Sequence, residues 1–277
     1  MIELPEAAVL ASQLIGAVRG KRIAGVIAAA SPHKFAWFHG DPARYSALLC
    51  GKKICSAASF GGFVEIEAGD MRLVFSEGVA LRFHRPVEDR PGKHQLLVEF
   101  DDSSALSGCV QMYGGLLAFK AGTCDNRYYA IAKAAPSPLC DGFDREYFES
   151  LLCATAAEKL SAKAFLATEQ RIPGLGNGVL QDILHKAMLH PKRKIGTLSA
   201  KERVALLLAI KTTLAEMTRK GGRDTEKDLH GNAGGYRTVL SKNTVDQPCP
   251  KCGSRIAKEA YLGGAIYYCP GCQKLQA

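Results

Sequence analysis

The sequence predicts an α+β protein of several domains: a leading helix with a β-sandwich, a group of helices, and a small C-terminal zinc finger. Apolar residues recur near every second position in several stretches between residues 22 and 112, which is typical of strands. After a linker containing prolines the apolar spacing becomes helical, and four paired cysteines follow near the C-terminus. The 277 residues leave room for two ordinary domains and the finger.

The first half is expected to be one helix followed by strands. Residues 3–19 carry leucines at helical spacing and are followed by Gly20, which is a common helix stop. Strands are expected at residues 22–29, 63–68, 72–76, 95–100 and 105–112. Residues 101–104 are rich in turn formers and would connect the last two strands. We therefore expect a mostly antiparallel β-sandwich with one leading helix.

The second half is expected to be helical. Pro136 and Pro138 interrupt regular structure in a linker, and helices are expected at residues 144–153, 160–169, 178–188 and 200–219. Ser199 and Glu202 have the spacing of a capping box at the start of the last helix. Its apolar side is expected to consist of Val204, Leu207, Leu214 and Met217. Residues 223–243 are rich in glycine and charge, so we expect a loop with room to move.

Four cysteines near the C-terminus have the spacing of a metal site. Cys249 and Cys252 form one C-x2-C pair, and sixteen residues later Cys269 and Cys272 form a second. Two such pairs can present four thiolates to one tetrahedral Zn²⁺, which in a finger this small is needed for folding. We expect one structural Zn²⁺, with redox pairs or disulfides as the alternative.

Composition narrows the class of protein. Ten cysteines without an export signal favour reduced thiols and a cytoplasmic protein, and no stretch approaches the roughly 20 apolar residues of a membrane helix. The net charge is +9, and residues 186–223 contain ten Lys or Arg but only two acids. This run, which includes Lys192, Arg193 and Arg223, predicts a phosphate-binding surface, although a solvated helix face is the alternative.

The segment Gly174-Leu175-Gly176-Asn177 is a second candidate for anion binding. Its two glycines allow a sharp turn, and Asn177 stands where a helix is expected to begin, so free backbone amides and a side-chain amide would point the same way. A tight turn with an Asn cap explains the same residues without a ligand. The basic residues after His190-Pro191 favour DNA phosphate.

Several motifs together resemble one known family. The N-terminal Glu3-Leu4-Pro5-Glu6, the Gly174–Asn177 turn with His190-Pro191 after it, and the four-cysteine finger with Gln273 just beyond are similar to those of the formamidopyrimidine-DNA glycosylase and endonuclease VIII family. The resemblance covers nearly the whole chain. It implies an N-terminal helix on a β-sandwich, a helix-two-turns-helix bundle and a zinc finger. The implied domains are the sandwich (1–133), a linker (134–143), the bundle and loop (144–243), and the finger (244–277).

The resemblance also implies an activity in DNA base-excision repair. Such enzymes bind damaged duplex DNA, flip out an oxidised base, excise it and nick the abasic strand. Glu3 matches the catalytic acid and Glu6 the second N-terminal carboxylate, while Ile2 could supply the attacking amine only if Met1 is removed. The implied DNA contacts are Lys163, Gly176, Asn177, Lys192, Arg193, Tyr113 as a wedge, and Arg223 on the loop that reads the flipped base.

Three positions depart from the family pattern. Ile2 replaces the nucleophilic proline, Gly62 stands in place of a strand lysine, and Ala265 stands where an arginine grips the phosphates. The loop at residues 75–78 lacks the usual Met wedge, and the loop at 111–114 lacks the Arg. We expect a monomeric DNA glycosylase with doubtful strand cleavage, acting on damaged or abasic double-stranded DNA and not on membranes. The alternative is a catalytically silent protein that binds damaged or abasic DNA.

Overall fold

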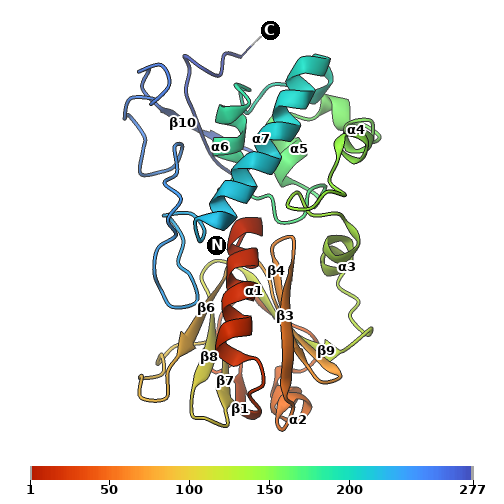
Figure 1. Cartoon of the computed structure of the whole chain (residues 1–277), viewed down its shortest axis with the longest axis vertical. Coiled ribbons are helices and arrows are strands. Elements are labelled where there is room, and N and C mark those ends of the chain that lie inside the picture. The colour runs from red at the N-terminus through yellow and green to blue at the C-terminus, as the bar shows by residue number, and fades with distance from the viewer. Residues whose placement is uncertain (1, 276–277) are drawn as a thin grey trace. The chain divides into compact units, whose positions relative to one another are not determined.

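The computed structural model describes residues 2–275, which form two compact units (Figure 1). The first unit contains residues 2–134 and 220–235, and the second contains residues 135–219 and 236–275. The division near residue 134 lies at the expected linker. Residues 220–235, expected to belong with the helical bundle, associate instead with the first unit, where Leu229 joins the core.

Two antiparallel-rich sheets build the first unit. One sheet has the strand order β1-β7-β8-β6 and the other has the order β2-β9-β5-β4-β3, in which only the pairing of β2 with β9 is parallel. The strands are β1 (Ile23–Ala28), β2 (Ala36–Phe38), β3 (Ile54–Phe60), β4 (Phe63–Ala68), β5 (Met71–Phe75), β6 (Val79–His84), β7 (Leu96–Phe100), β8 (Ala105–Val110) and β9 (Gly114–Lys120).

One apolar core lies between these sheets. It combines Val98 and Leu106 of the first sheet with Val64 and Leu73 of the second, so the sheets form the expected sandwich. Helix α1 (Leu4–Val18) packs on β3 and β4 through its apolar stripe, which includes Leu14 with no exposed surface. The unit is completed by the 3₁₀ turn η1 (Pro42–Arg44) and by helices α2 (Tyr45–Leu49) and α3 (Arg127–Ala134).

Three connections of the five-stranded sheet lie at the same end. Phe60 pairs with Phe63 across the β3–β4 turn, Phe75 pairs with both Val64 and Leu116, and Ala36 pairs with Gly114. The connections at residues 61–62, 76–78 and 111–113 and the start of β2 therefore share one edge. Figure 1 shows the start of α1 beside the β3–β4 turn at this edge.

Short helices and a hairpin form the second unit. Its helices are α4 (Arg145–Leu152), η2 (Ala157–Lys159), α5 (Ala162–Ala167), α6 (Leu180–Lys186), η3 (Ile195–Thr197) and α7 (Ala200–Arg219). Strands β10 (Ala257–Tyr261) and β11 (Gly264–Tyr268) form the hairpin that lies between the two cysteine pairs. Among the described residues, no helix has both the length and the apolar character needed to cross a bilayer.

The structure corrects some details of the expected elements. Ser199 and Glu202 do form the capping box. The backbone amide of Ser199 donates to Glu202 Oε2 at 2.8 Å, and the backbone amide of Glu202 donates to Ser199 Oγ at 3.3 Å. Val204, however, is 37% exposed and lies off the apolar side of α7. Helix α6 begins only at Leu180, so Asn177 precedes the helix in a turn and does not cap it.

Candidate active site and nucleic-acid interface

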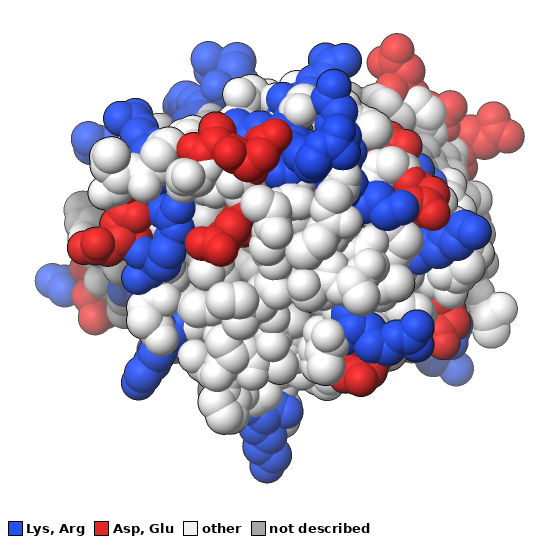
Figure 2. All heavy atoms as spheres, turned by 90° about the horizontal axis from the view of Figure 1, so that it is seen from below, with Lys and Arg blue, Asp and Glu red and all other residues white. Residues whose placement is uncertain are grey.

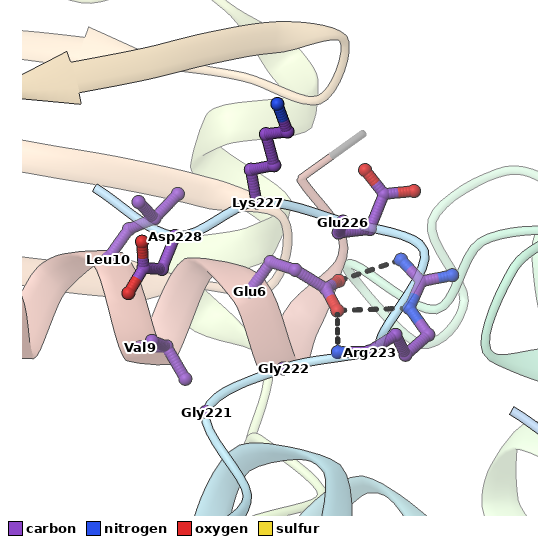
Figure 3. A pocket seen from close by; sticks show the side chains of 9 residues that line it. All are labelled: Glu6, Val9, Leu10, Gly221, Gly222, Arg223, Glu226, Lys227 and Asp228. Carbon is purple, nitrogen blue, oxygen red and sulfur yellow. Dashed lines mark hydrogen bonds and ion pairs between the residues drawn. The ribbon is translucent and has the colours of Figure 1, made fainter. Parts of the chain in front are cut away.

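The start of α1 carries two buried carboxylates held by one arginine. Glu3 and Glu6 are 2% and 5% exposed, and the backbone amide of Glu3 donates to Glu6 Oε2 at 3.3 Å. Arg223 donates to Glu6 from Nε at 3.0 Å and from Nη2 at 2.8 Å, while its Nη1 lies 3.6 Å from Glu3 Oε2. Figure 3 shows Glu6 projecting from α1 toward the loop that carries Arg223. We name Glu3, Glu6 and Arg223 the carboxylate clamp.

The loop backbone closes against the same carboxylate. The amide of Arg223 donates to Glu6 Oε1 at 3.1 Å, and the preceding Gly222 has φ of +96°. A Cβ at Gly222 would lie 3.5 Å from Glu6 Oε1, so the left-handed conformation, more than space, requires glycine there. Burial alone would lower the pKa of Arg223. The negative charges of Glu3 and Glu6 together have the larger effect, so the pKa of Arg223 is raised above its ordinary value. The guanidinium therefore stays charged, and its positive charge beside Glu3 favours the ionised form of that carboxylate.

Two further groups of the first unit lie in the field of Glu3. Burial, and then the charge of Glu3, raise the pKa of Glu77 above 4.5. Burial, and then Glu77 and Glu3, raise the pKa of Tyr113. Glu77 follows β5 and Tyr113 precedes β9, at the edge of the sheet described above. Opposite environments thus act on neighbouring carboxyls, because Arg223 favours ionised Glu3 while burial favours protonated Glu77.

In the second unit, three polar side chains hold the backbone of the β10–β11 hairpin. Lys163 Nζ donates to the carbonyl of Tyr261, and Asn177 Nδ2 donates to the carbonyl of Ala265 at 3.0 Å. Gln181 Oε1 accepts from the amide of Tyr267 at 3.1 Å. A Cβ at Gly264 would lie 3.5 Å from Lys163 Nζ and 3.8 Å from Asn177 Nδ2, so both side chains converge on the hairpin tip.

The four cysteines form a cluster that fits a metal ion. Their Sγ atoms lie within 4.8 Å of one another, with 3.9 Å between Cys249 and Cys272 and 3.3 Å between Cys252 and Cys269. Tetrahedral Zn²⁺ with bonds of about 2.3 Å places sulfur atoms about 3.8 Å apart. The alternative of disulfides is wrong, since all ten cysteines are described and all are free. Hydrogen bonds from Ser254 lower the pKa of Cys252 to about 6, which favours the ligating thiolate.

Groups around the cluster fix it to the helices. His185 Nε2 lies 3.3 Å from Cys249 Sγ, and burial lowers the pKa of this histidine, which favours its neutral form. Gln273 is fully buried, accepts from the amide of Cys269 at 2.9 Å and donates to the carbonyl of Leu189 at 2.8 Å. The motif residue Gln273 thus ties the second cysteine pair to the end of the α6 segment.

The whole chain is similar in sequence to known formamidopyrimidine-DNA glycosylases. It is 29% identical over 280 residues to the formamidopyrimidine-DNA glycosylase of Bacillus licheniformis, covering 99% of this chain and 100% of the relative. It is also 29% identical over 284 residues to the enzyme of Brevibacillus brevis, covering 100% of both chains.

Solved structures agree in fold. The MutM (Fpg) protein of Thermus thermophilus has a TM-score of 0.81 at 23% identity, covering 99% of this chain and 100% of that one. The Lactococcus lactis Fpg in complex with DNA containing an abasic site has a TM-score of 0.84 at 22% identity, covering 98% and 99%. No protein-family model matches the chain.

Over its whole length the chain is similar to formamidopyrimidine-DNA glycosylases, and it shares the fold of the solved Fpg structures. The three departures from the family pattern have clear places in the structure. Ile2 is 4% exposed and is part of the first unit's core, whereas Met1 lies outside the described residues. Gly62 occupies the tight β3–β4 turn, and Ala265 lies in β11, where it offers its carbonyl to Asn177 and only a methyl group as side chain.

Several basic residues counted toward a phosphate surface are engaged within the protein. Arg193 is 9% exposed and donates to Thr197, while Lys192 forms an ion pair with Glu259. Arg223 belongs to the carboxylate clamp. The face of the protein seen in Figure 2 mixes both charge signs around a broad uncharged area. The positive net charge is therefore not gathered into one patch on that face.

The structure brings Glu3, Glu6 and Arg223 together, and it brings Lys163 and Asn177 together at the finger hairpin. Gly176 lies in the turn before α6 beside Asn177. The sequence did not predict the pairing of Arg223 with the N-terminal carboxylates. Arg223 and Glu6 are 217 residues apart along the chain. It also missed Glu77, because the family pattern marks the loop at residues 75–78 only for a wedge. No local pattern marks either feature.

Proposed function

We propose that the protein is a DNA glycosylase of base-excision repair that binds damaged duplex DNA, flips out an oxidised base and hydrolyses its glycosidic bond. The observation that carries the proposal is the position of Glu3, a carboxylate buried at the start of α1 beside a charged arginine. The relatives of matching length are named formamidopyrimidine-DNA glycosylases, and a solved neighbour is a complex with DNA containing Fapy-dG.

In the proposed reaction Glu3 accepts a proton from water as the water oxygen attacks the sugar carbon. The carbon–nitrogen bond to the base breaks, and its electron pair leaves with the base, which must then gain a proton. Glu77, held toward its protonated form, is the proposed donor. Glu6 acts as a positioning residue, because it holds the guanidinium that keeps Glu3 ionised.

We infer that strand cleavage depends on the N-terminal amine. The lysine expected on the strand is replaced by Gly62, so an amine at Ile2 after removal of Met1 would be the remaining family-like nucleophile. Mass spectrometry of the intact protein and borohydride trapping on abasic duplex test this step together. Intact Met1 with no trapped adduct is the expected result, and an adduct would establish Schiff-base chemistry.

The proposed DNA contacts are those expected from the sequence, with their roles adjusted. Lys163, which is 5% exposed, uses one of its three N–H groups on Tyr261 and has two more that would bind a phosphate placed at the hairpin tip, and Gly176 and Asn177 present the adjoining turn. Tyr113 would occupy the gap left by a flipped base. Lys192, Arg193 and Arg223 would contact DNA only after giving up their present partners. The DNA complex is proposed to contain one protein monomer.

We propose one structural Zn²⁺ at Cys249, Cys252, Cys269 and Cys272. When bound, it would stabilise the folded hairpin by crosslinking the two cysteine pairs and would take no part in the reaction. The described sulfur separations support tetrahedral coordination.

A second function is favoured by the burial of the clamp. Glu3 and Arg223 are each only 2% exposed, so a water molecule and a sugar must displace part of the clamp to reach Glu3. A protein in which the clamp stays closed would bind damaged or abasic DNA without excising a base.

A panel of duplexes, each with one oxidised base, separates the two functions. The enzyme releases a base in at least one duplex and loses this release in Glu3→Gln. The silent binding protein retains salt-dependent binding and releases nothing from any duplex.

A further inference from the structure

Two exposed aromatic side chains and one partly buried tyrosine lie at one edge of the five-stranded sheet of the first unit. Phe35 and Trp37 are 48% and 53% exposed, and the ring centre of Tyr113 lies 6.0 Å from that of Trp37, at an interplanar angle of 46°. Met112, next to Tyr113, is 63% exposed. We name Phe35, Trp37 and Tyr113 the aromatic platform.

Backbone pairing fixes the platform in place. Strand β2 is the edge strand of its sheet, with Trp37 opposite Gly115 of β9 in parallel register. The amide of Gly114 donates to the carbonyl of Phe35 at 3.0 Å, so the pairing continues one residue before β2. Tyr113 directly precedes β9. The rings therefore stand on or next to paired backbone, and the exposure of Phe35 and Trp37 is a feature of the folded unit.

The chemistry of the platform suits nucleobases. An aromatic ring stacks on any base through its π-face, and each such contact is worth roughly 1–3 kcal/mol. Lys34 places its Nζ 5.4 Å from the centre of the Phe35 ring, so a cation that could meet a phosphate lies beside the platform. Two acidic groups act on Tyr113, namely Glu77, whose charged form burial disfavours, and Glu3 of the carboxylate clamp. Aliphatic side chains would bind a protein partner equally well. Three aromatic rings with an adjacent lysine therefore favour nucleobases as the partner.

We propose that the aromatic platform binds unpaired nucleobases of single-stranded DNA by stacking, as a site separate from the carboxylate clamp. This binding does not require the protein to excise a base. In a duplex that has been locally opened, the same surface would hold bases that have lost their pairing partners.

Trp37 allows a direct test, because it is the only tryptophan of the chain. The full-length zinc-bound protein is titrated with an oligothymidine strand of about 12 nucleotides, and with a strand of the same length that carries no bases. Stacking predicts saturable quenching of Trp37 emission by the first strand and little response to the second. Equal responses to both strands would show phosphate binding alone and would overturn the proposal.

Variants locate the binding site. Anisotropy of a labelled oligothymidine should show that Phe35→Ala and Tyr113→Ala each weaken binding by about 5- to 140-fold, the range that corresponds to one lost stack. Tyr128→Ala is the matched control, since Tyr128 is a 55% exposed aromatic of α3 in the same unit, and it should change affinity by less than about twofold. Unchanged affinity in both platform variants would contradict the proposal.

Two further results separate the platform from other functions. A change in Trp37 emission with protein concentration, in the absence of DNA, would mean that a second copy covers the platform, and the proposal would fail. Glu3→Gln should retain the full Trp37 response even if it abolishes base release. Loss of that response in Glu3→Gln would show that the platform and the clamp are one site.

Discussion

The carboxylate clamp of the first unit and the hairpin contacts of the second use polar side chains in opposite ways. In the clamp, the groups that meet are charged side chains, with Arg223 bonded to Glu6 at 2.8 Å and 3.6 Å from Glu3. At the hairpin, Lys163, Asn177 and Gln181 bind backbone carbonyls and an amide. The clamp therefore depends on the identity of each residue, while the hairpin contacts depend on the path of the β10–β11 backbone.

This difference explains why the finger can depart from the family pattern and remain docked. The contact between Asn177 and residue 265 uses the carbonyl of Ala265, which any residue would provide. The side chain at position 265 can change without altering the hairpin. The clamp has no such freedom, because removing one partner of a buried ion pair leaves an uncompensated charge.

The largest expected effect is on the hairpin after metal removal. Zinc binding to finger peptides is worth about 10–16 kcal/mol, so a chelator under reducing conditions should unfold residues 249–272 while the β-strands of the first unit stay protected from hydrogen exchange. Cys249→Ser should have the same effect. Cys55→Ser, at an exposed cysteine of β3, is the control and should leave exchange unchanged. Retained protection of β10 and β11 without metal would mean that the backbone contacts alone hold the hairpin.

The next effect is on the stability of the first unit. Arg223→Met leaves two buried carboxylates without their cation, so urea unfolding should show a loss of about 3–5 kcal/mol. Lys52→Met removes the cation of the exposed Lys52–Asp70 pair in the same unit and should cost less than about 1 kcal/mol. Equal losses of unfolding free energy in the two variants would show that burial does not strengthen the contribution of the clamp to stability.

The sequence predicts the elements better than it predicts the clamp. The spacing of apolar residues, together with residues typical of helix ends, predicted α1, α7 and the strand at residues 63–68, because these signals are local. Strands β2, β3, β6 and β9 were missed, since β2 is a three-residue edge strand and β9 is buried along most of its length and shows no alternation. Of the candidate site, Glu3, Glu6 and the cysteines came from motifs. Their link to Arg223 and to Glu77 is made by tertiary structure and has no signature along the chain.

A gain of DNA affinity is expected from Ala265→Arg. Because docking uses the backbone, the substitution should change stability by less than about 0.5 kcal/mol. It should add one phosphate contact, which tightens binding to abasic duplex and steepens the salt dependence by about one ion. Ala265→Lys should give a smaller gain, since an ammonium cannot bind a phosphate in a bidentate way. Loss of stability in both variants would contradict the account of the hairpin.

The smallest expected effect concerns Glu77 and pH. Since its folded pKa is raised, the folded state binds more protons than the unfolded state above pH 4.5, so the stability of the wild type should fall as pH rises from 4.5 through that folded pKa. Glu77→Gln should remove this part of the pH dependence and be the more stable protein at neutral pH. Urea titrations at several pH values measure it, and parallel curves for the two proteins would exclude a raised folded pKa for Glu77.

The central claim is that Arg223 keeps Glu3 ionised so that it can activate water. Single-turnover release of an oxidised base from duplex DNA, with binding measured in parallel, tests it most directly. The account predicts that Glu3→Gln binds the duplex as tightly as the wild type and releases base at least about 100-fold more slowly, the usual contribution of a general base. Release by Glu3→Gln at the wild-type rate would contradict it.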